Sequence, residues 1–323
     1  MSHPGPWARW VARTSRREAG DTLAAVRICV GLAVVLNLGA TAIAGVPELS
    51  WIDAIHGGAH SHRPERLPWL IATLGGPTPA VIWGLLTTTM VAALALTLGC
   101  CSRLAALIAG QGLLALRMLN PFATGAYDAL MTNALWILVL CDASATASLR
   151  CRLRTGAWTS SDCEVAAWPR YLLVFQLGLT YTMAGIQKVS AAWMPGDRSA
   201  LYRILQMPAW ARFDMRWLAR PGVYALTELS SVLVWLFELS WPLLLIALAL
   251  GRPAPPTAGP LRRALARYDL RLPYLAFGLT MHLGIAVLMA VGPFHWIMLA
   301  YYLALAPPGE LRQLAARLTR RAH

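Results

Sequence analysis

Long apolar stretches with few charged residues set the strongest limit on how this chain folds. Of its 323 residues, 57% are hydrophobic and only 13% are charged, and the mean hydropathy is +0.52. A soluble domain of ordinary composition carries about a quarter charged residues. A run of about 20 apolar residues is long enough for a helix to cross the hydrocarbon core of a bilayer. We therefore expect an all-α, polytopic membrane protein with short loops.

Eight segments are predicted to be transmembrane helices. They are 22–45, 79–98, 103–119, 127–141, 169–189, 224–250, 273–291 and 293–305. The last segment is too short to cross about 30 Å upright. The region 273–305 is therefore either one long helix broken at Gly292 and Pro293 or a tight hairpin. This pattern predicts an N-terminal segment at 1–21, a transmembrane domain at 22–306 and a basic tail at 307–323.

Arginines gather in the segments between the apolar stretches. They precede the first span (Arg9, Arg13, Arg16, Arg17), separate the fourth from the fifth (Arg150, Arg152, Arg154) and the sixth from the seventh (Arg252, Arg262, Arg263, Arg267, Arg271), and follow the eighth (Arg312, Arg317, Arg320, Arg321). Because cytoplasmic loops carry an excess of Lys and Arg, eight spans place all four segments and both termini in the cytoplasm. This distribution accounts for the net charge of +13, so we expect no nucleic-acid partner.

The segment 190–222 departs from this charge rule. It carries five arginines, although alternation of the spans places it on the outer side, and it is rich in aromatic residues (Trp193, Tyr202, Trp210, Phe213, Trp217). Basic and aromatic residues together are typical of helices that lie in the membrane interface. We expect an interfacial helical segment on the outer side.

Eight ionisable side chains fall within or beside the apolar stretches, where each needs a partner or a function. They are Arg27, Arg117, Asp128, Lys188, Glu228, Glu238, His282 and His295. A guanidinium keeps its proton in proteins, so it suits a fixed partner better than proton transfer. The structural alternative to a functional role is therefore pairing of Arg27 or Arg117 with Glu228 or Glu238, which would lock helices together.

Lys188 is the only lysine of the chain, and it stands near the end of an apolar run, in YTMAGIQKVSAAW at 181–193. A lysine in an apolar pocket can lose its proton near neutral pH and act as a base or nucleophile. Alternatively, Lys188 extends to the membrane interface beside Trp193. His282 can relay a proton or bond a quinone oxygen, or it can form a simple hydrogen bond between helices.

The motif HGGAHSH at 56–62 supplies three weak candidates for metal binding: His56, His60 and His62. Neutral imidazoles bind zinc or copper, but the loop has no cysteine or obvious carboxylate partner, so we expect a solvated loop and no metal. The six cysteines show no CxxC or zinc-type spacing. The sequence contains no nucleotide-binding loop, GxSxG or HExxH motif, which disfavours common ATPases and hydrolases.

The stretch YTMAGIQKVSAAWMPG resembles the hallmark of the membrane region of vitamin K-dependent gamma-glutamyl carboxylase and of the related bacterial HTTM proteins. Its hallmark positions are occupied by Tyr181, Ala184, Gly185, Lys188, Trp193 and Gly196. The stretches 125–149 and 281–300 are similar to two other spans of that family, so the resemblance runs over 20–305. It implies a bacterial inner-membrane protein in which Lys188 is the base that acts on a hydroquinone of the vitamin K or menaquinone type.

In the carboxylase that this chain resembles, oxidation of the hydroquinone by O2 produces a strong base that leads to carboxylation of a glutamate. The present chain differs at three points. Tyr127 and Asp128 stand about where the carboxylase has an Asn-His pair, Gln187 replaces a second lysine, and the chain stops soon after the last span instead of continuing into a lumenal domain. We expect a quinone-sized membrane pocket rather than carboxylation of a protein.

The resemblance and the chemistry together give a set of candidate site residues. Lys188 and His282 are the catalytic candidates, and Tyr181, Gly185, Trp193, Glu238, Asp128 and Gln176 are the candidates for binding a quinone or lipid-like substrate. A secreted or periplasmic peptide is the expected partner besides the lipid bilayer. Two alternatives remain: a non-catalytic accessory protein for maturation of a secreted peptide, and a transporter, which would require inverted repeats that the sequence does not show.

Overall fold

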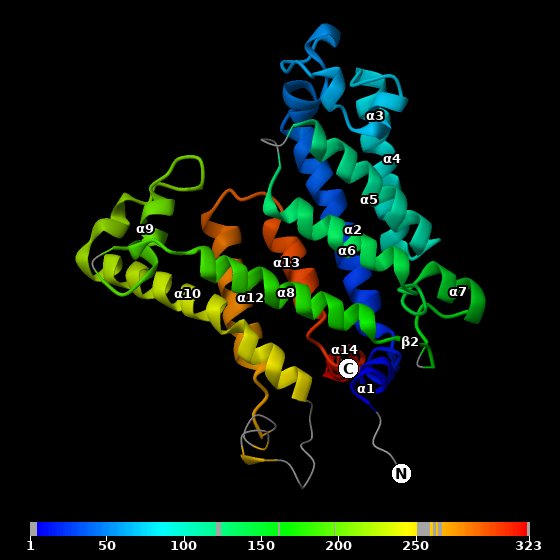
Figure 1. The fold of residues 1–323 in the computed structure, drawn as a ribbon, viewed down its shortest axis with the longest axis vertical. Helices are drawn as coiled ribbons and strands as arrows, with labels where there is room; N and C mark the ends of the chain where they lie inside the picture. The colour runs from blue at the N-terminus through cyan, green and yellow to red at the C-terminus, as the bar shows by residue number, and fades with distance from the viewer. Residues whose placement is uncertain are drawn as a thin grey trace. The chain divides into compact units, whose positions relative to one another are not determined.

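The computed structural model is mostly helical (Figure 1) and describes residues 5–120, 124–160, 162–196, 198–250, 259–260, 263 and 267–321. Arg252 and Arg262 of the predicted cytoplasmic loop lie outside these residues. The chain divides into two compact units. The first unit contains residues 1–171 and 292–323, and the second contains residues 172–291. Helix α8 (Trp168–Gln187) begins in the first unit and continues in the second.

Five helices build the core of the first unit: α2 (Asp21–Ile43), α4 (Pro79–Leu98), α5 (Ser102–Leu119), α6 (Ala126–Leu140) and α13 (Phe294–Leu303). Helices α4 and α5 pack on each other, α5 packs on α6, and α2 contacts α4, α6 and α13. Their shared core is apolar and fully buried, and Val30, Ile82 and Leu135 are among its members. The hydroxyl of Tyr301 on α13 donates a hydrogen bond of 3.0 Å to the Leu130 carbonyl of α6.

Short elements surround this core. They are α1 (Pro6–Thr14), β1 (Arg17–Ala19), η1 (Pro47–Trp51), η2 (Ala54–His56), η3 (Pro64–Arg66), α3 (Trp69–Thr73), α7 (Leu149–Thr155), β2 (Glu164–Ala166) and α14 (Glu310–Arg321). Strands β1 and β2 pair antiparallel, with Glu18 opposite Val165. Arg170 donates two hydrogen bonds, of 2.7 and 2.8 Å, to the carboxylate of Glu18. This bidentate pair fixes the start of α8 to the segment that leads into α2.

The second unit contains the rest of α8, η5 (Ala191–Trp193), α9 (Ala200–Leu205), η6 (Arg216–Ala219), α10 (Pro221–Leu250) and α12 (Arg271–Leu288). The segment predicted to be interfacial folds back onto the helix ends. Leu205, Met215 and Leu218 form a small buried cluster against which Leu288 packs. The backbone N–H of Arg212 donates to the Leu288 carbonyl at 3.0 Å. The segment is therefore a compact lobe of short helical elements, and its location at a membrane interface stays a prediction.

Among the described residues, five helices are long and apolar enough to cross a bilayer: α2, α4, α5, α10 and α12. Helix α6 is apolar but has only 15 residues. Helices α8 and α13 are not among the five candidate membrane-spanning helices. Helix α12 ends at Leu288 and α13 begins at Phe294, so the chain breaks in the region where the sequence predicts a break. A helical, multi-pass arrangement is confirmed, whereas the number of eight spans remains a prediction.

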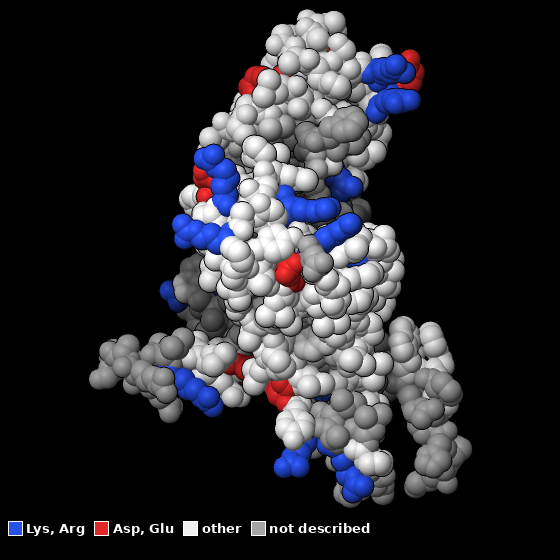
Figure 2. Space-filling model, turned by 90° about the vertical axis from the view of Figure 1, so that its left-hand side faces the viewer, with Lys and Arg blue, Asp and Glu red and all other residues white. Residues whose placement is uncertain are grey.

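The outer surface of the long helices is apolar. On α10 alone, Leu226, Leu229, Leu233, Leu236 and Leu243 are exposed, and Figure 2 shows charged side chains in separate patches on a largely uncharged face. An apolar surface of this extent is unfavourable in water. In a bilayer the same leucines contact lipid tails, which agrees with the length and hydropathy of these helices.

Arg27 is a fully buried cation on α2, with an exposed fraction of 0%. Its guanidinium donates hydrogen bonds to three backbone carbonyls, those of Ala143 (3.1 Å), Thr97 (3.3 Å) and Ala147 (2.5 Å). Thr97 belongs to the last turn of α4, where carbonyls have no partner within the helix. The predicted pairing of Arg27 with a glutamate is therefore wrong. Carbonyls at a helix end and in the turn after α6 bind the guanidinium instead.

We expect Arg27→Met to lower the free energy of unfolding by about 1–3 kcal/mol, because it leaves buried carbonyls without a hydrogen-bond donor. Thermal and denaturant unfolding of the detergent-purified protein would measure this loss. Arg66→Met removes an exposed arginine and serves as the control with no expected change. Equal stability of the two variants would show that the three carbonyl contacts do not hold α2 to its neighbours.

Candidate functional site

Lys188 lies directly after the last residue of α8, within the second unit. Its Nζ is 2.5 Å from Oε2 of Glu238 on α10. The same ammonium lies 4.8 Å from the centre of the Trp193 ring, and it donates a longer hydrogen bond of 3.4 Å to the Ala184 carbonyl. The side chain of Lys188 is 19% exposed and that of Glu238 is 8% exposed. The two charges thus form a partly closed ion pair covered by an indole.

Two glycines of α8 allow this pair to form, because they bring α8 close to α10. A Cβ atom on Gly185 would be 3.0 Å from the Leu239 backbone nitrogen, and one on Gly178 would be 2.6 Å from Cδ1 of Leu245. Small residues at a helix interface let two backbones approach closely. The contacts run from Gly178 with Leu245 to Lys188 with Glu238, so the two helices are antiparallel.

A second polar pair joins α8 to α12. The hydroxyl of Tyr181 lies 2.6 Å from Nε2 of His282, and His282 is only 1% exposed. The Tyr181 ring stacks on Trp241 of α10, with ring centres 4.9 Å apart and an angle of 10° between the planes. Tyr181 precedes Lys188 by seven residues, about two helical turns, and Lys188 directly follows the end of α8. The C-terminal part of α8 and the residue after it therefore contribute to both polar pairs.

Aromatic side chains enclose the Tyr181–His282 pair. Phe237 meets the Tyr181 ring edge-to-face at 5.2 Å and packs on Phe277 of α12 at 4.6 Å. Tyr274, also on α12, packs on Trp241 at 5.3 Å and donates a hydrogen bond of 2.8 Å to the Ser240 carbonyl. A hydrogen bond in such an apolar setting is electrostatically stronger than one in water.

The second unit brings together most of the candidate residues predicted from the sequence. Tyr181, Gly185, Lys188, Trp193, Glu238 and His282 all take part in the contacts described above. Gln176 is on α8 and partly buried, but it precedes Lys188 by twelve residues, about 18 Å along a helix. Sequence reasoning missed Phe237, Trp241 and Tyr274. The aromatic residues on both sides of Glu238 in the run LFELSW were the available signal.

Asp128 belongs to the first unit and is engaged in local bonds. Its carboxylate accepts a hydrogen bond of 2.9 Å from the Gly125 N–H and one of 3.3 Å from the Asn37 side-chain amide. The first bond caps the N-terminus of α6 and the second joins α6 to α2. Both bonds are structural contacts of the first unit.

The histidine loop is organised by a carboxylate rather than by imidazoles. His56 and His60 are exposed, and the rings of His60 and His62 meet edge-to-face at 4.8 Å. Asp53 accepts backbone hydrogen bonds from Ile55 (3.0 Å) and His62 (2.8 Å), and these bonds hold the pKa of Asp53 below its usual range. Within the described residues, no three His, Cys, Asp or Glu side chains are grouped so that they could hold a metal ion.

Two cavities stand out within the described residues, and both are lined by residues of the first unit. Neither is lined by Lys188 or by the residues that surround it. A quinone-sized pocket at Lys188 therefore remains a prediction.

Gly185→Ala and Gly284→Ala form a matched pair that tests the contact between α8 and α10. A Cβ on Gly185 meets backbone, whereas one on Gly284 meets no atom within 4 Å. We expect Gly284→Ala to leave stability unchanged or to raise it by up to about 1 kcal/mol, because Ala favours helix. Gly185→Ala should lower the thermal unfolding temperature. A stabilised Gly185→Ala variant would contradict the close packing.

Tyr181→Phe removes the hydroxyl that bonds to His282 while it keeps the ring that stacks on Trp241. We expect a loss of about 1–3 kcal/mol in the free energy of unfolding, the usual cost of removing one partner from a buried hydrogen bond. Tyr268→Phe is the control, because Tyr268 is 61% exposed. If both variants unfold at the wild-type temperature, the hydroxyl does not join α8 to α12.

The HTTM domain family model matches residues 16–251 of the chain. The match includes Lys188, Glu238 and their surroundings and ends before α12, which carries His282. Comparisons with curated proteins and with solved structures gave no match. Because the family model covers more than half of the sequence and the helices are apolar enough to span a bilayer, the chain belongs to the HTTM domain family and is an integral membrane protein.

Proposed function

We propose that this protein is a membrane enzyme in which Lys188 acts as a base on a hydroxyl of a lipid-like hydroquinone, of the vitamin K or menaquinone type. The observation that supports the proposal is the short contact of 2.5 Å between Lys188 and Glu238 in a partly closed setting. A base needs an amine that substrate can reach and a means of stabilising the ammonium that forms on proton uptake. The Lys188 side chain is 19% exposed, so a substrate can reach its amine. The carboxylate of Glu238 stabilises the ammonium.

The charge balance of the pair suits proton uptake. With a neutral amine and an ionised Glu238, the pair has one net negative charge in an apolar region, where a single charge is costly. When the amine takes a proton from a phenolic hydroxyl, the pair becomes a neutral ammonium–carboxylate pair. Glu238 thus holds the amine in place and stabilises its protonated form. The ammonium of the ion pair must first pass its proton to water at the exposed part of the side chain, and it does so again after each turnover.

Tyr181 and His282 are proposed to form a proton relay near the base. A phenol and an imidazole 2.6 Å apart can exchange a proton, and the surrounding aromatic rings keep water away from them. Trp193 lies against the Lys188 ammonium at 4.8 Å and is proposed to close one side of the substrate site. A flat aromatic substrate would bind in contact with this indole.

A lipid-like substrate is favoured by the residues next to Lys188. Met183, Ile186 and Val189 are apolar and exposed, so the surface beside the amine suits contact with lipid rather than with water. A hydroquinone dissolved in the bilayer could approach the amine along this surface. Within this proposal, oxidation of the deprotonated substrate by O2 is coupled to modification of a partner or of a small molecule, as the resemblance to the carboxylase implies.

The test uses the full chain reconstituted in lipid nanodiscs with reduced menaquinone and O2. Oxygen uptake and quinone products, identified by mass spectrometry, are the readouts. We expect Lys188→Ala and Lys188→Arg to lose turnover by about 10²–10⁴-fold, the usual contribution of a general base, because a guanidinium cannot give up its proton. Arg220→Ala, which removes an exposed cation of the same unit, should retain full turnover.

Lys188→Arg distinguishes loss of the base from loss of the ion pair, because it retains the positive charge beside Glu238. A Lys188→Arg variant that folds and turns over at the wild-type rate would exclude Lys188 as the base. Absence of any quinone-dependent turnover in the wild type would exclude this substrate class. In both cases a non-catalytic accessory role in the maturation of a secreted peptide becomes the better proposal.

A further inference from the structure

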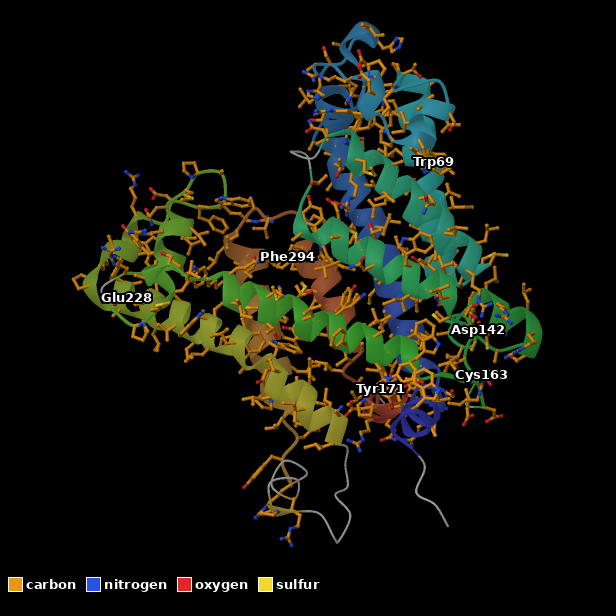
Figure 3. The ribbon with its side chains drawn as sticks, viewed as in Figure 1. Trp69, Asp142, Cys163, Tyr171, Glu228 and Phe294 are labelled. Atoms are coloured by element: carbon orange, nitrogen blue, oxygen red, sulfur yellow. The ribbon has the colours of Figure 1, made fainter. Side chains whose placement is uncertain are left out.

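A cavity of about 760 Å³ lies in the first unit, between the start of α5, the turn after α6 and helix α7. Its lining includes Ser102 and Arg103 of α5, Asp142 of the turn, and Arg150 and Arg154 of α7. Figure 3 shows Asp142 beside α7. None of these residues takes part in the contacts of Lys188. The cavity is therefore independent of the proposed catalytic site.

The start of α5 supplies hydrogen-bond donors to this cavity. The first backbone bond of the helix runs from the Ala105 N–H to the Cys101 carbonyl, so the N–H groups of the three preceding residues lie at the open end of the helix. The first turn has no acidic residue. An 18-residue helix has a partial positive charge at this end, which attracts anions.

Ser102 gives an independent indication of a ligand. It is 3% exposed and lines the cavity, yet its hydroxyl has no hydrogen-bond partner among the residues that the structure describes. A buried hydroxyl without a partner costs free energy. A ligand oxygen in the cavity would accept a hydrogen bond from this hydroxyl and remove the cost.

The charge of the lining is positive. Three arginines face one carboxylate, that of Asp142, which is paired with Arg150 at 2.7 Å. The side chain of Arg103 donates to the Cys141 carbonyl at 3.1 Å, and that of Arg154 lies 3.1 Å from the Cys163 sulfur. These contacts hold the arginines at the cavity and leave two positive charges without a carboxylate. Phosphate is an anion that both guanidinium groups and helix N-termini bind.

Leucines line the same cavity beside the basic residues. Leu104 and Leu153 are largely exposed, and Leu149 is partly buried. Inorganic phosphate has no apolar part that could contact these leucines, whereas a phospholipid would place its acyl chains along them. We infer that the cavity binds an anionic phospholipid, with its phosphate at the N-terminus of α5 near Ser102 and its acyl chains against the leucines.

The experiment measures binding to the full chain in detergent, with short-chain phosphatidylglycerol, phosphatidylcholine and inorganic phosphate as separate probes. Native mass spectrometry and thermal shift give the apparent Kd for each probe. We expect phosphatidylglycerol to bind about tenfold more tightly than phosphatidylcholine, because net negative charge favours the arginines. Equal binding of both lipids would overturn the inference. Saturable binding of inorganic phosphate that blocks the lipid would replace the lipid with free phosphate as the ligand.

Two neighbouring arginines of α7 give a matched pair of variants. Arg154 lines the cavity, whereas Arg152 is exposed on the same helix and is outside the lining. We expect Arg154→Gln to weaken binding of phosphatidylglycerol about tenfold and Arg152→Gln to change it less than twofold. Ser102→Ala should weaken it about threefold to tenfold through loss of one hydrogen bond. Equal effects of the two arginine variants, or an unaltered Kd in Ser102→Ala, would contradict the site.

Discussion

Close approach of α8 to α10 is the contact on which the second unit depends. Gly178 and Gly185 lie on one face of α8. A Cβ on Gly185 would meet the backbone of α10, and one on Gly178 would meet the side chain of Leu245. The resulting antiparallel register places Tyr181 on Trp241 at one level and Lys188 on Glu238 at another. A larger residue at Gly185 would meet the backbone of α10. The charged contact and the aromatic contact are therefore consequences of the same packing.

A fully buried cation in the first unit and a partly buried cation in the second are bound by different groups. Arg27 has three carbonyl acceptors and no carboxylate among its described partners, so its positive charge is spread over fixed dipoles. Lys188 has one carboxylate and one indole. The guanidinium cannot lose its proton and its several donors fix it in place, as suits a structural bond. An ammonium, unlike a guanidinium, can give up a proton, so the Lys188–Glu238 pair is compatible with the proposed proton transfer.

Much of the fold follows from hydropathy, because a bilayer allows few ways to satisfy the backbone of a long apolar segment. Helices α4 and α5 begin and end within one residue of the predicted segments 79–98 and 103–119. Contacts between residues far apart in the sequence could not be predicted from it. Glu238 is fifty residues from Lys188, and His282 is 101 residues from Tyr181, so both pairs depend on helix register that no local pattern encodes. The predicted partner of Arg27 was wrong because open carbonyls at helix ends leave no trace in the sequence.

Residue type at position 188 is itself informative, because this chain otherwise uses arginine for its basic side chains. Arginine can bind a carboxylate through two parallel hydrogen bonds and can stack on an aromatic ring. A purely structural ion pair would therefore be served at least as well by arginine. Lysine differs in one respect that matters here: its ammonium can become a neutral amine. The single lysine thus occupies the position where a carboxylate, an indole and limited exposure meet, and this combination supports proton transfer over simple pairing.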